Sequence, residues 1–235
     1  MERRVADCPG AQAGWRIGAL AIIGRLIMLD TAPTKRLMCA ACLRPSKTCI
    51  CHLAAPVAAV VDVLILQHPL EVANAKGSAR LLHLSLPGST MVTGERFDAA
   101  VLHGLLYRGG RQPVLLYPEM AGERSLGMAA PPAFDAASIG DPSQLRLVVL
   151  DGTWRKSRKM LYLNPLLQSL PRLPLTQVPS SLYRIRKAHA PDQLSTLEAS
   201  CYALMQLEAG SEKFAPILTG FEAFVDQYAT VATHA

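Results

Sequence analysis

Apolar residues gather in four short runs along the chain, each with the length and composition of a buried β-strand. The first run is rich in β-branched residues and is interrupted only by Asp62. Near-continuous apolarity over such a length is typical of strands that are covered on both faces of a parallel sheet. The sequence predicts strands at residues 57–66, 114–117 and 145–150, and a weaker one at 173–178.

Helical patterns lie between and after these strands. The predicted helices are residues 73–83, residues 98–107, one that begins at Gly152 or Thr153, residues 193–209, and residues 216 to about 230. Ser195 and Glu198 have the spacing of a capping box, which marks a helix start. Because strands alternate with helices, the predicted fold class is α/β, with a mostly parallel sheet and flanking helices.

Polar side chains follow three of the predicted strands. They are Gln67-His68-Pro69 with Glu71, then Tyr117-Pro118-Glu119, and then the run from Asp151 to Lys156. Ligands of open α/β sheets bind at the carboxyl ends of the strands, so these segments are the candidate site. The chain has no Gly-x-Gly-x-x-Gly, Walker loop or Gly-x-Ser-x-Gly, which argues against the commonest dinucleotide, nucleoside-triphosphatase and hydrolase sites.

Four cysteines fall within thirteen residues, as Cys39, Cys42, Cys49 and Cys51. Two close pairs joined by a short turn bring four thiolates to one tetrahedral ion, and Zn²⁺ favours such ligands. The sequence therefore predicts a structural zinc site. Two disulfides, a redox Cys-x-x-Cys, or His52 in place of one sulfur are the alternatives.

The first 38 residues carry an apolar stretch, residues 17–29, that resembles a secretory signal. It contains Arg25, is too short to span a bilayer, and precedes no small-x-small cleavage site. We therefore expect a poorly structured extension at residues 1–38 and a cytoplasmic protein with no membrane partner. Cys8 and Cys201 lie far from the cluster and are expected to be ordinary terminal or buried residues.

Composition and charge refine this picture. The chain has 235 residues, half of them hydrophobic and 18% charged, which is enough for one sizeable core and excludes a disordered or fibrous protein. Residues 151–190 carry 8 Lys and Arg against 1 acidic residue, whereas residues 191–235 carry 1 against 6. A basic block inside a folded domain suggests RNA or a nucleotide phosphate as partner, and a solvated face is the alternative.

The chain resembles the DTW-domain family, named for an Asp-x-Thr-Trp element that stands here at residues 151–154. Further matching elements appear in the expected order between residues 39 and 205. They are the four-cysteine cluster, Gln67-His68-Pro69 with Glu71, Arg80-Leu81-Leu82, Leu115-Leu116-Tyr117-Pro118, Trp154-Arg155-Lys156, Ser181-x-Tyr183-x-x-Arg186 and Ser195-Thr196-Leu197-Glu198-Ala199.

This resemblance implies a tRNA-uridine aminocarboxypropyltransferase related to SPOUT-type enzymes. Such an enzyme transfers the 3-amino-3-carboxypropyl group of S-adenosylmethionine to N3 of a uridine and releases methylthioadenosine. It also implies a C-terminal knot that holds the cofactor. The domains are then the extension at residues 1–38, a zinc lobe at residues 39–56 and a catalytic domain at residues 57–235.

Roles for single residues follow from the same resemblance. Asp151 is the candidate general base for the uridine imide, with Thr153 and Trp154 beside it in the catalytic set. An ordinary Asp, with a pKa of about 3.9, matches that proton poorly, so Asp151 needs burial or acts instead as a hydrogen-bond acceptor or helix cap. Trp154 is expected to stack on a base or on adenine, with a core position as the alternative.

The remaining candidates form two sets. The expected cofactor-binding residues are Tyr117, Pro118, Asp151, Gly152, Ser181, Tyr183, Arg186, Ser195, Thr196 and Glu198. The expected RNA-binding residues are Arg155, Lys156, Arg158, Lys159 and Arg184, while His68 is expected to be a turn residue. Two other functions remain open, namely a noncatalytic zinc-containing RNA-binding module and a SPOUT-type RNA methyltransferase.

Overall fold

A computed structural model of the chain describes residues 37–118, 131, 132, 134, 140–175, 179, 181, 194–210 and 212–232, with side chains to residue 227. The chain divides into two compact units between His52 and Leu53, and each is described by itself. Most of the expected extension at residues 1–38, and the stretch around Tyr183 to Arg186, lie outside the described residues.

The larger unit is built on a four-stranded sheet in which every neighbouring pair is parallel. The strands are β1 (Asp62–Gln67), β2 (Thr90–Thr93), β3 (Gln112–Leu116) and β4 (Leu145–Asp151), in the order β2-β1-β4-β3. Strands β1 and β4 occupy the centre, and all seven residues of β4 are buried. The predicted α/β class with a parallel sheet is confirmed.

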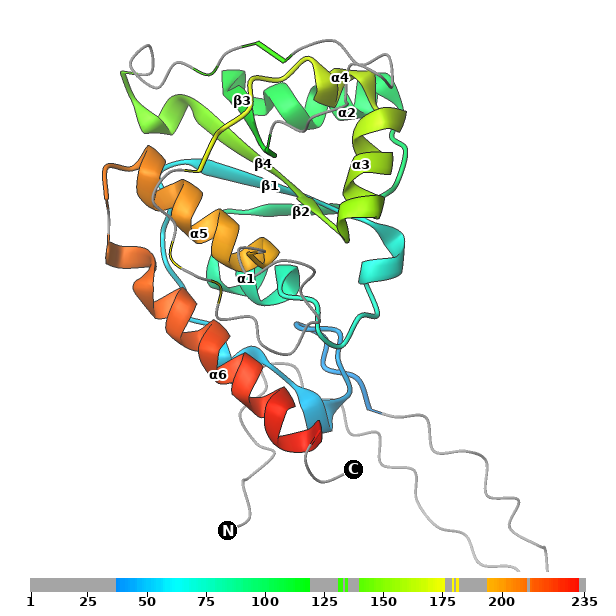
Figure 1. Cartoon of the computed structure of the whole chain (residues 1–235), viewed down its shortest axis with the longest axis vertical. Coiled ribbons are helices and arrows are strands. Elements are labelled where there is room, and N and C mark those ends of the chain that lie inside the picture. Colours follow the sequence, from blue (N-terminus) through cyan, green and yellow to red (C-terminus); the bar gives the residue numbers. More distant parts are fainter. Residues whose placement is uncertain are drawn as a thin grey trace, which may run out of the picture. The chain divides into compact units, whose positions relative to one another are not determined.

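Helices cover both faces of this sheet (Figure 1). Helices α2 (Ala99–Tyr107), α3 (Trp154–Leu163) and α4 (Pro165–Gln168) lie on one face, and α1 (Ala79–Ser85), α5 (Thr196–Leu207) and α6 (Ala215–Ala232) on the other. Side chains of alternate strand residues, such as Leu64, Leu66, Val148 and Leu150, form one core with α2, α3 and α4. Residues between them, such as Ile65 and Asp151, therefore face the α1 and α5 side.

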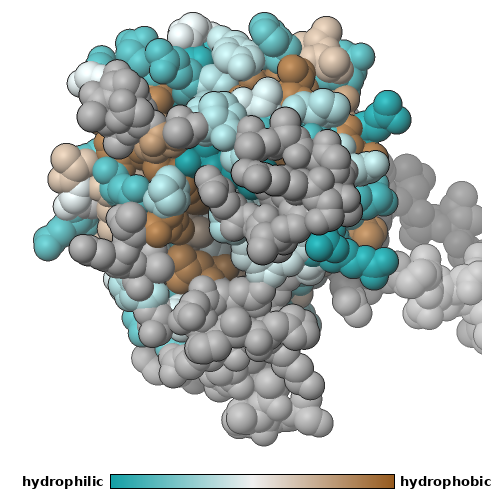
Figure 2. All heavy atoms as spheres, turned by 45° about the horizontal axis from the view of Figure 1, so that its top comes forward, coloured by the Kyte–Doolittle hydropathy of each residue, from teal (hydrophilic) through white to brown (hydrophobic). Residues whose placement is uncertain are grey.

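Short 3₁₀ turns connect these elements. They lie at Ser46–Thr48, Cys51–Leu53, Pro69–Glu71, Arg108–Gly110, Pro142–Gln144 and Glu212–Phe214. On the face shown in Figure 2, hydrophilic residues make up much of the described surface, and hydrophobic residues reach it in patches between them. Among the described residues, no helix has both the length and the hydropathy needed to cross a membrane.

The first and the last of the predicted strands differ most from the structure. The first strand begins at Asp62 and not at residue 57, because the backbone N–H groups of Val60 and Val61 donate to Oε1 of Glu208 at 2.8 and 3.0 Å and not to a neighbouring strand. The predicted strand at 173–178 is absent over its described part, residues 173–175. Arg172 instead forms a single parallel bridge to Leu115. Prolines at 171 and 174 have no N–H with which to extend a ladder.

Helix α1 begins at Ala79, six residues later than predicted. The Asn74 side chain accepts a hydrogen bond from the backbone N–H of Lys76 at 3.0 Å, and the N–H of Gly77 donates to the Asn74 carbonyl at 2.9 Å. This Asx turn competes with helix formation over residues 73–77. The segment between β1 and α1 is therefore a compact loop beside the carboxyl end of the sheet.

Candidate active site and four-cysteine cluster

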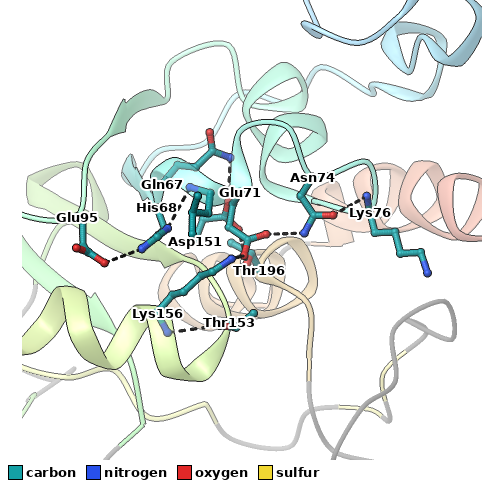
Figure 3. Close-up of polar contacts among 11 residues, drawn as sticks. Gln67, His68, Glu71, Asn74, Lys76, Glu95, Asp151, Thr153, Lys156 and Thr196 are labelled. Carbon is teal, nitrogen blue, oxygen red and sulfur yellow. Dashed lines mark hydrogen bonds and ion pairs between the residues drawn. The ribbon is translucent and has the colours of Figure 1, made fainter.

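Polar residues converge where β1 and β4 end. Gln67 and Asp151 are the last residues of these strands and are register partners, so their side chains project side by side on the α1 and α5 face. Figure 3 shows the Gln67, Asp151 and Thr196 side chains directed toward one another. Sequence reasoning placed ligand chemistry at these strand ends, and the structure brings these residues together.

Asp151 is 4% exposed, and both of its carboxylate oxygens accept hydrogen bonds. Nε2 of Gln67 donates to Oδ2 at 2.9 Å, and Oγ1 of Thr196 donates to Oδ1 at 2.9 Å. Bonds to both oxygens fix the orientation of the carboxylate about its last torsion angle. Burial disfavours the charged form of a carboxylate, whereas the hydrogen bonds that it accepts favour that form.

Gln67 itself is 3% exposed and has only half of its amide paired. Within the described residues, Oε1 is buried and has no hydrogen-bond partner. A buried acceptor without a donor costs about 1–3 kcal/mol, so such atoms are rare in folded proteins and often mark a ligand or a water. The Gln67 oxygen is thus an acceptor, next to Asp151, that suits an N–H donor of a ligand.

Helix α3 begins at Trp154, three residues after Asp151, and Asp151 does not cap it. Thr153 is the N-cap, and its Oγ1 accepts from the backbone N–H of Lys156 at 3.4 Å. Gly152 lies close to the same turn, because a Cβ added there would stand 3.1 Å from Cβ of Lys156. The helix-cap interpretation of Asp151 is therefore wrong.

The start of α5 contributes Thr196 to the site and closes a second buried network. Ser195 and Glu198 form the predicted capping box, with the Ser195 Oγ accepting from the Glu198 N–H at 3.1 Å and the Glu198 carboxylate accepting from the Ser195 N–H at 2.7 Å. The Ser181 hydroxyl donates to the same carboxylate at 2.9 Å. Glu198 is fully buried. These bonds hold the α5 N-terminus, and with it Thr196, against the end of β4.

Aromatic side chains stand at the end of β3. Tyr117 is buried, and its ring meets that of Trp154 edge-on, with centroids 5.9 Å apart. The Arg172 guanidinium lies 5.3 Å from the centre of the Tyr117 ring and donates to the Pro118 carbonyl at 3.2 Å. Trp154 is 44% exposed, so the core position considered for it is wrong. An exposed indole ring at this edge is suited to stacking.

Two lysines of α3 are engaged in ion pairs. Nζ of Lys156 lies 2.7 Å from Oε1 of the buried Glu71, whose other oxygen accepts from Asn74 at 2.6 Å. Nζ of Lys159 lies 3.0 Å from Oε2 of Glu95. These pairs tie α3 to the loops that follow β1 and β2.

His68 joins the same set of contacts. Its Nδ1 accepts from the Leu70 N–H at 3.1 Å, so Nε2 carries the proton that it shares with Glu95 Oε1 at 2.9 Å. This bond, and then Lys159, hold the pKa of Glu95 below its ordinary value. His68 is buried and caps the Pro69–Glu71 turn, as expected for a turn residue.

Some predicted site residues lie outside the described part of the chain, namely Glu119, Tyr183, Arg184 and Arg186. Arg155 and Arg158 are described and exposed on α3. Sequence reasoning missed the roles of Gln67, Glu71 and Glu95. The role of Gln67 was detectable, because Gln67 and Asp151 each follow an apolar run directly. In a parallel sheet, polar residues at the ends of two neighbouring strands are expected to lie side by side.

The smaller unit holds the cysteine cluster. The Sγ atoms of Cys39, Cys42, Cys49 and Cys51 all lie within 4.8 Å of one another. The separations are 3.6 Å between Cys39 and Cys51 and 3.8 Å between Cys42 and Cys49. A tetrahedral ion with Zn–S bonds of about 2.3 Å places its sulfurs about 3.8 Å apart, whereas a disulfide bond is about 2.05 Å long. None of these four cysteines forms a disulfide within the described residues, and their spacing fits a metal rather than two disulfides.

Backbone groups support this cluster. Burial raises the pKa of the Cys39 thiol, but N–H groups of Cys42 and Ala41 and the Cys51 side chain outweigh it and set the pKa at about 6. Burial raises the pKa of the Cys42 thiol. The turn between the first two cysteines and Arg44 passes through Leu43 in the left-handed region, with φ of 58°. N–H groups directed at sulfur are the arrangement that stabilises thiolate ligands.

Comparisons with known proteins identify the family of this chain. The DTW domain model matches residues 36–229. The chain is similar to "tRNA-uridine aminocarboxypropyltransferase 2" of Drosophila melanogaster, with 32% identity over 77% of this chain and 70% of the relative. Relatives of the same name from Macaca fascicularis and Mus musculus are 30% and 29% identical, covering 88% and 74% of this chain and 76% and 57% of their own lengths.

No solved structure is significantly similar to the chain. The family match, however, spans most of the sequence and includes both the cysteine cluster and the Asp151 to Trp154 element. The chain belongs to the DTW domain family.

Proposed function

We propose that this protein transfers the 3-amino-3-carboxypropyl group of S-adenosylmethionine to N3 of a uridine in tRNA. The observation that carries the proposal is the buried Asp151 carboxylate, held by Gln67 and Thr196 at the carboxyl end of a parallel sheet. Family membership supports it, as do the relatives named tRNA-uridine aminocarboxypropyltransferase.

The transfer is a substitution at the carbon that joins the amino-acid chain to sulfur. The imide N–H of uridine loses its proton, N3 forms a bond to that carbon, and the carbon–sulfur bond breaks with its electron pair passing to sulfur, which leaves methylthioadenosine. Asp151 accepts the imide proton or orients the imide by a hydrogen bond. Gln67 and Thr196 are positioning residues, since each acts on the reaction through the carboxylate.

The donor group fits the polar atoms around Asp151. S-adenosylmethionine carries an ammonium group with several N–H donors, and a carboxylate beside the unpaired Oε1 of Gln67 offers acceptors for it. The proposed cofactor-binding residues lie at the strand ends and at the start of α5, except for Tyr183 and Arg186, which are outside the described part of the chain. The full set is Tyr117, Pro118, Asp151, Gly152, Ser181, Tyr183, Arg186, Ser195, Thr196 and Glu198. Asp151, Thr153 and Trp154, at the carboxyl edge of the sheet, are the proposed catalytic residues, and we call this place the catalytic edge. We propose that the C-terminal part of the chain forms a SPOUT-like knot that holds the cofactor.

RNA would approach along α3. Arg155 and Arg158 are exposed, and neither has a carboxylate partner among the described residues. Lys156 and Lys159 belong to the same basic surface but are partly neutralised by Glu71 and Glu95. With Arg184, they supply the positive field that attracts a polyanion.

The four-cysteine cluster is proposed to hold one structural Zn²⁺ ion. Four protein sulfurs fill a tetrahedral coordination shell, so the metal has no open position for water or substrate and stabilises the fold of its own lobe. We propose the division into an extension at residues 1–38, a zinc lobe at residues 39–56 and a catalytic domain at residues 57–235. Reduced thiols are in keeping with a cytoplasmic protein.

Mass spectrometry of nucleosides tests this function. Purified protein is incubated with unmodified tRNA and S-adenosylmethionine, and the tRNA is then digested. We expect one uridine to gain the aminocarboxypropyl group, with methylthioadenosine in stoichiometric amount. A gain of only a methyl group would indicate a methyltransferase, and binding of tRNA with no mass gain would indicate a noncatalytic RNA-binding module.

A further inference from the structure

The exposed side of α3 carries aromatic and arginine side chains in alternation. Trp154, Arg158 and Tyr162 are spaced four residues apart, which places them in one row along the helix. Trp154 is 44% exposed and Tyr162 is 57% exposed, and Arg158 is exposed between them. The buried residues of the same helix, Ser157, Met160 and Leu161, face the sheet. Tyr162 therefore contributes little to the core.

The basic side chains of α3 differ in whether an acidic residue binds them. Lys156 and Lys159 lean toward the loops after β1 and β2, where Glu71 and Glu95 bind them. Arg155 and Arg158 form no ion pair within the described residues. Among the described residues, the positive charge of α3 that no carboxylate binds thus lies on its arginines, and Arg158 stands between the two exposed rings.

The spacing of the row matches a nucleic-acid strand. Eight residues of α-helix at 1.5 Å each separate Trp154 from Tyr162 by about 12 Å. Stacked nucleotides rise about 3.4 Å each, so this length corresponds to about three or four nucleotides. Phosphates of such a strand lie between the two rings, where Arg158 stands. Aromatic rings interleaved with cations are the surface that single-stranded RNA binds.

We propose that the Trp154–Arg158–Tyr162 row is a docking track for a single-stranded RNA segment, with Tyr162 stacking on a nucleobase and Arg158 binding the adjacent phosphate. The proposal rests on the function proposed above, since it assumes an RNA substrate. It adds a base-stacking residue, Tyr162, about 12 Å along the helix from the catalytic edge. A base paired within a duplex has no free face, so the track selects an unpaired stretch that leads toward Asp151.

Binding of a single-stranded uridine-rich RNA oligomer, measured over a series of salt concentrations, tests the track. Tyr162→Leu keeps an apolar side chain but removes the ring, and we expect its affinity to fall about ten- to a hundredfold. Tyr162→Phe keeps the ring and should bind as the unmutated protein does. Arg158→Gln should weaken binding and reduce the slope of log K against log salt by about 0.7, the value for one phosphate contact on a single strand.

Matched controls come from α2, which also carries exposed side chains. Tyr107 is 41% exposed there and Arg108 follows it, so Tyr107→Leu and Arg108→Gln should leave affinity and salt slope unchanged. The track is refuted if Tyr162→Leu binds as Tyr107→Leu does, if Tyr162→Phe is as weak as Tyr162→Leu, or if a polyglutamate peptide competes as well as the RNA.

Nucleoside analysis of the unmutated protein is run in parallel. If it modifies tRNA while Tyr162→Leu binds normally, only the track fails, and if it modifies nothing, the proposed function fails instead.

Discussion

Gln67 and Asp151 face each other as register partners at the ends of β1 and β4, and the Gln67 amide donates to the Asp151 carboxylate at 2.9 Å. The Thr196 hydroxyl donates to the other carboxylate oxygen from the start of α5. The carboxylate is thereby held between the two central strands and a helix from the opposite end of the sequence. Residues that are 84 and 45 positions away from Asp151 set its orientation.

Removing either donor should slow the reaction without unfolding the protein. A hydrogen bond to a charged group contributes about 1.5–3 kcal/mol, part of which here fixes the carboxylate. We expect Gln67→Met and Thr196→Val each to lower kcat about tenfold, and the pH profile of kcat to move as the environment of Asp151 changes. Thr219→Val is the control, since the exposed Thr219 hydroxyl donates to the Ala215 carbonyl of its own helix. Unchanged kcat and pH profile in both site variants would remove the positioning role.

Loss of the carboxylate should be more severe. Asp151→Asn keeps the size of the side chain and one oxygen that accepts a hydrogen bond from either Thr196 or Gln67. The amide, however, cannot accept the imide proton of uridine. We expect the single-turnover rate of uridine modification to fall about 10²- to 10⁴-fold, with the thermal unfolding temperature little changed. Asp141→Asn, in the Pro142–Gln144 turn, should keep the full rate. A full rate in Asp151→Asn would mean that the base lies elsewhere.

Zinc content distinguishes the clustered cysteines from Cys201. Cys42→Ser should bind less than stoichiometric zinc and lose the compact turn around residues 39–51, because three thiolates leave the tetrahedral shell open. Cys201→Ala should keep one zinc ion per chain, since Cys201 is buried in α5. Elemental analysis of both purified variants measures the difference. Equal zinc contents, or no zinc in the unmutated protein, would contradict the proposed site.

The free energy of unfolding should decrease as the pH falls below 6.5, the ordinary pKa of histidine, because of His83. Burial first, and then the charge of Arg80, lower the pKa of His83 from 6.5 in the folded protein. The unfolded chain therefore takes up the proton at a higher pH than the folded protein does, so stability is present above pH 6.5 and is lost as the pH falls below it.

Urea unfolding at about pH 7.5 and pH 5.5 measures this loss. We expect the free energy of unfolding to decrease less between these values in His83→Gln than in the unmutated protein. His103→Gln, on the exposed side of α2, serves as the matched variant and should behave as the unmutated protein does. Identical decreases in all three proteins would exclude His83 as the cause.

The long apolar runs made three of the four strands predictable, but the edge strand β2 was not. Strands β1, β3 and β4 follow from such runs, whereas β2 has four residues, Thr90–Thr93, none of them buried, and lacks the pattern of a covered strand. An edge strand of this kind depends on pairing with β1 and not on its own composition. Glu95, which follows β2, was missed for the same reason.

Local capping chemistry was read correctly at Ser195 and Glu198 because it involves residues three positions apart. The identity of the α3 cap was less clear, since Asp151, Gly152 and Thr153 are all common capping residues. Pairing between Lys156 and Glu71, 85 positions apart, has no sequence signal at all. Charge on a helix identifies a basic face but not which of its side chains are already neutralised.

Transfer of isotopic label from S-adenosylmethionine to tRNA is the most direct test of whether the protein transfers the aminocarboxypropyl group. One sample carries label in the methyl group and a second carries it in the carboxyl group of the amino-acid chain, and each is incubated with unmodified tRNA and the purified protein. We expect that carboxyl label enters uridine, that methyl label leaves in methylthioadenosine, and that Asp151→Asn slows both. Methyl label in the RNA, or no label from either sample, would contradict it.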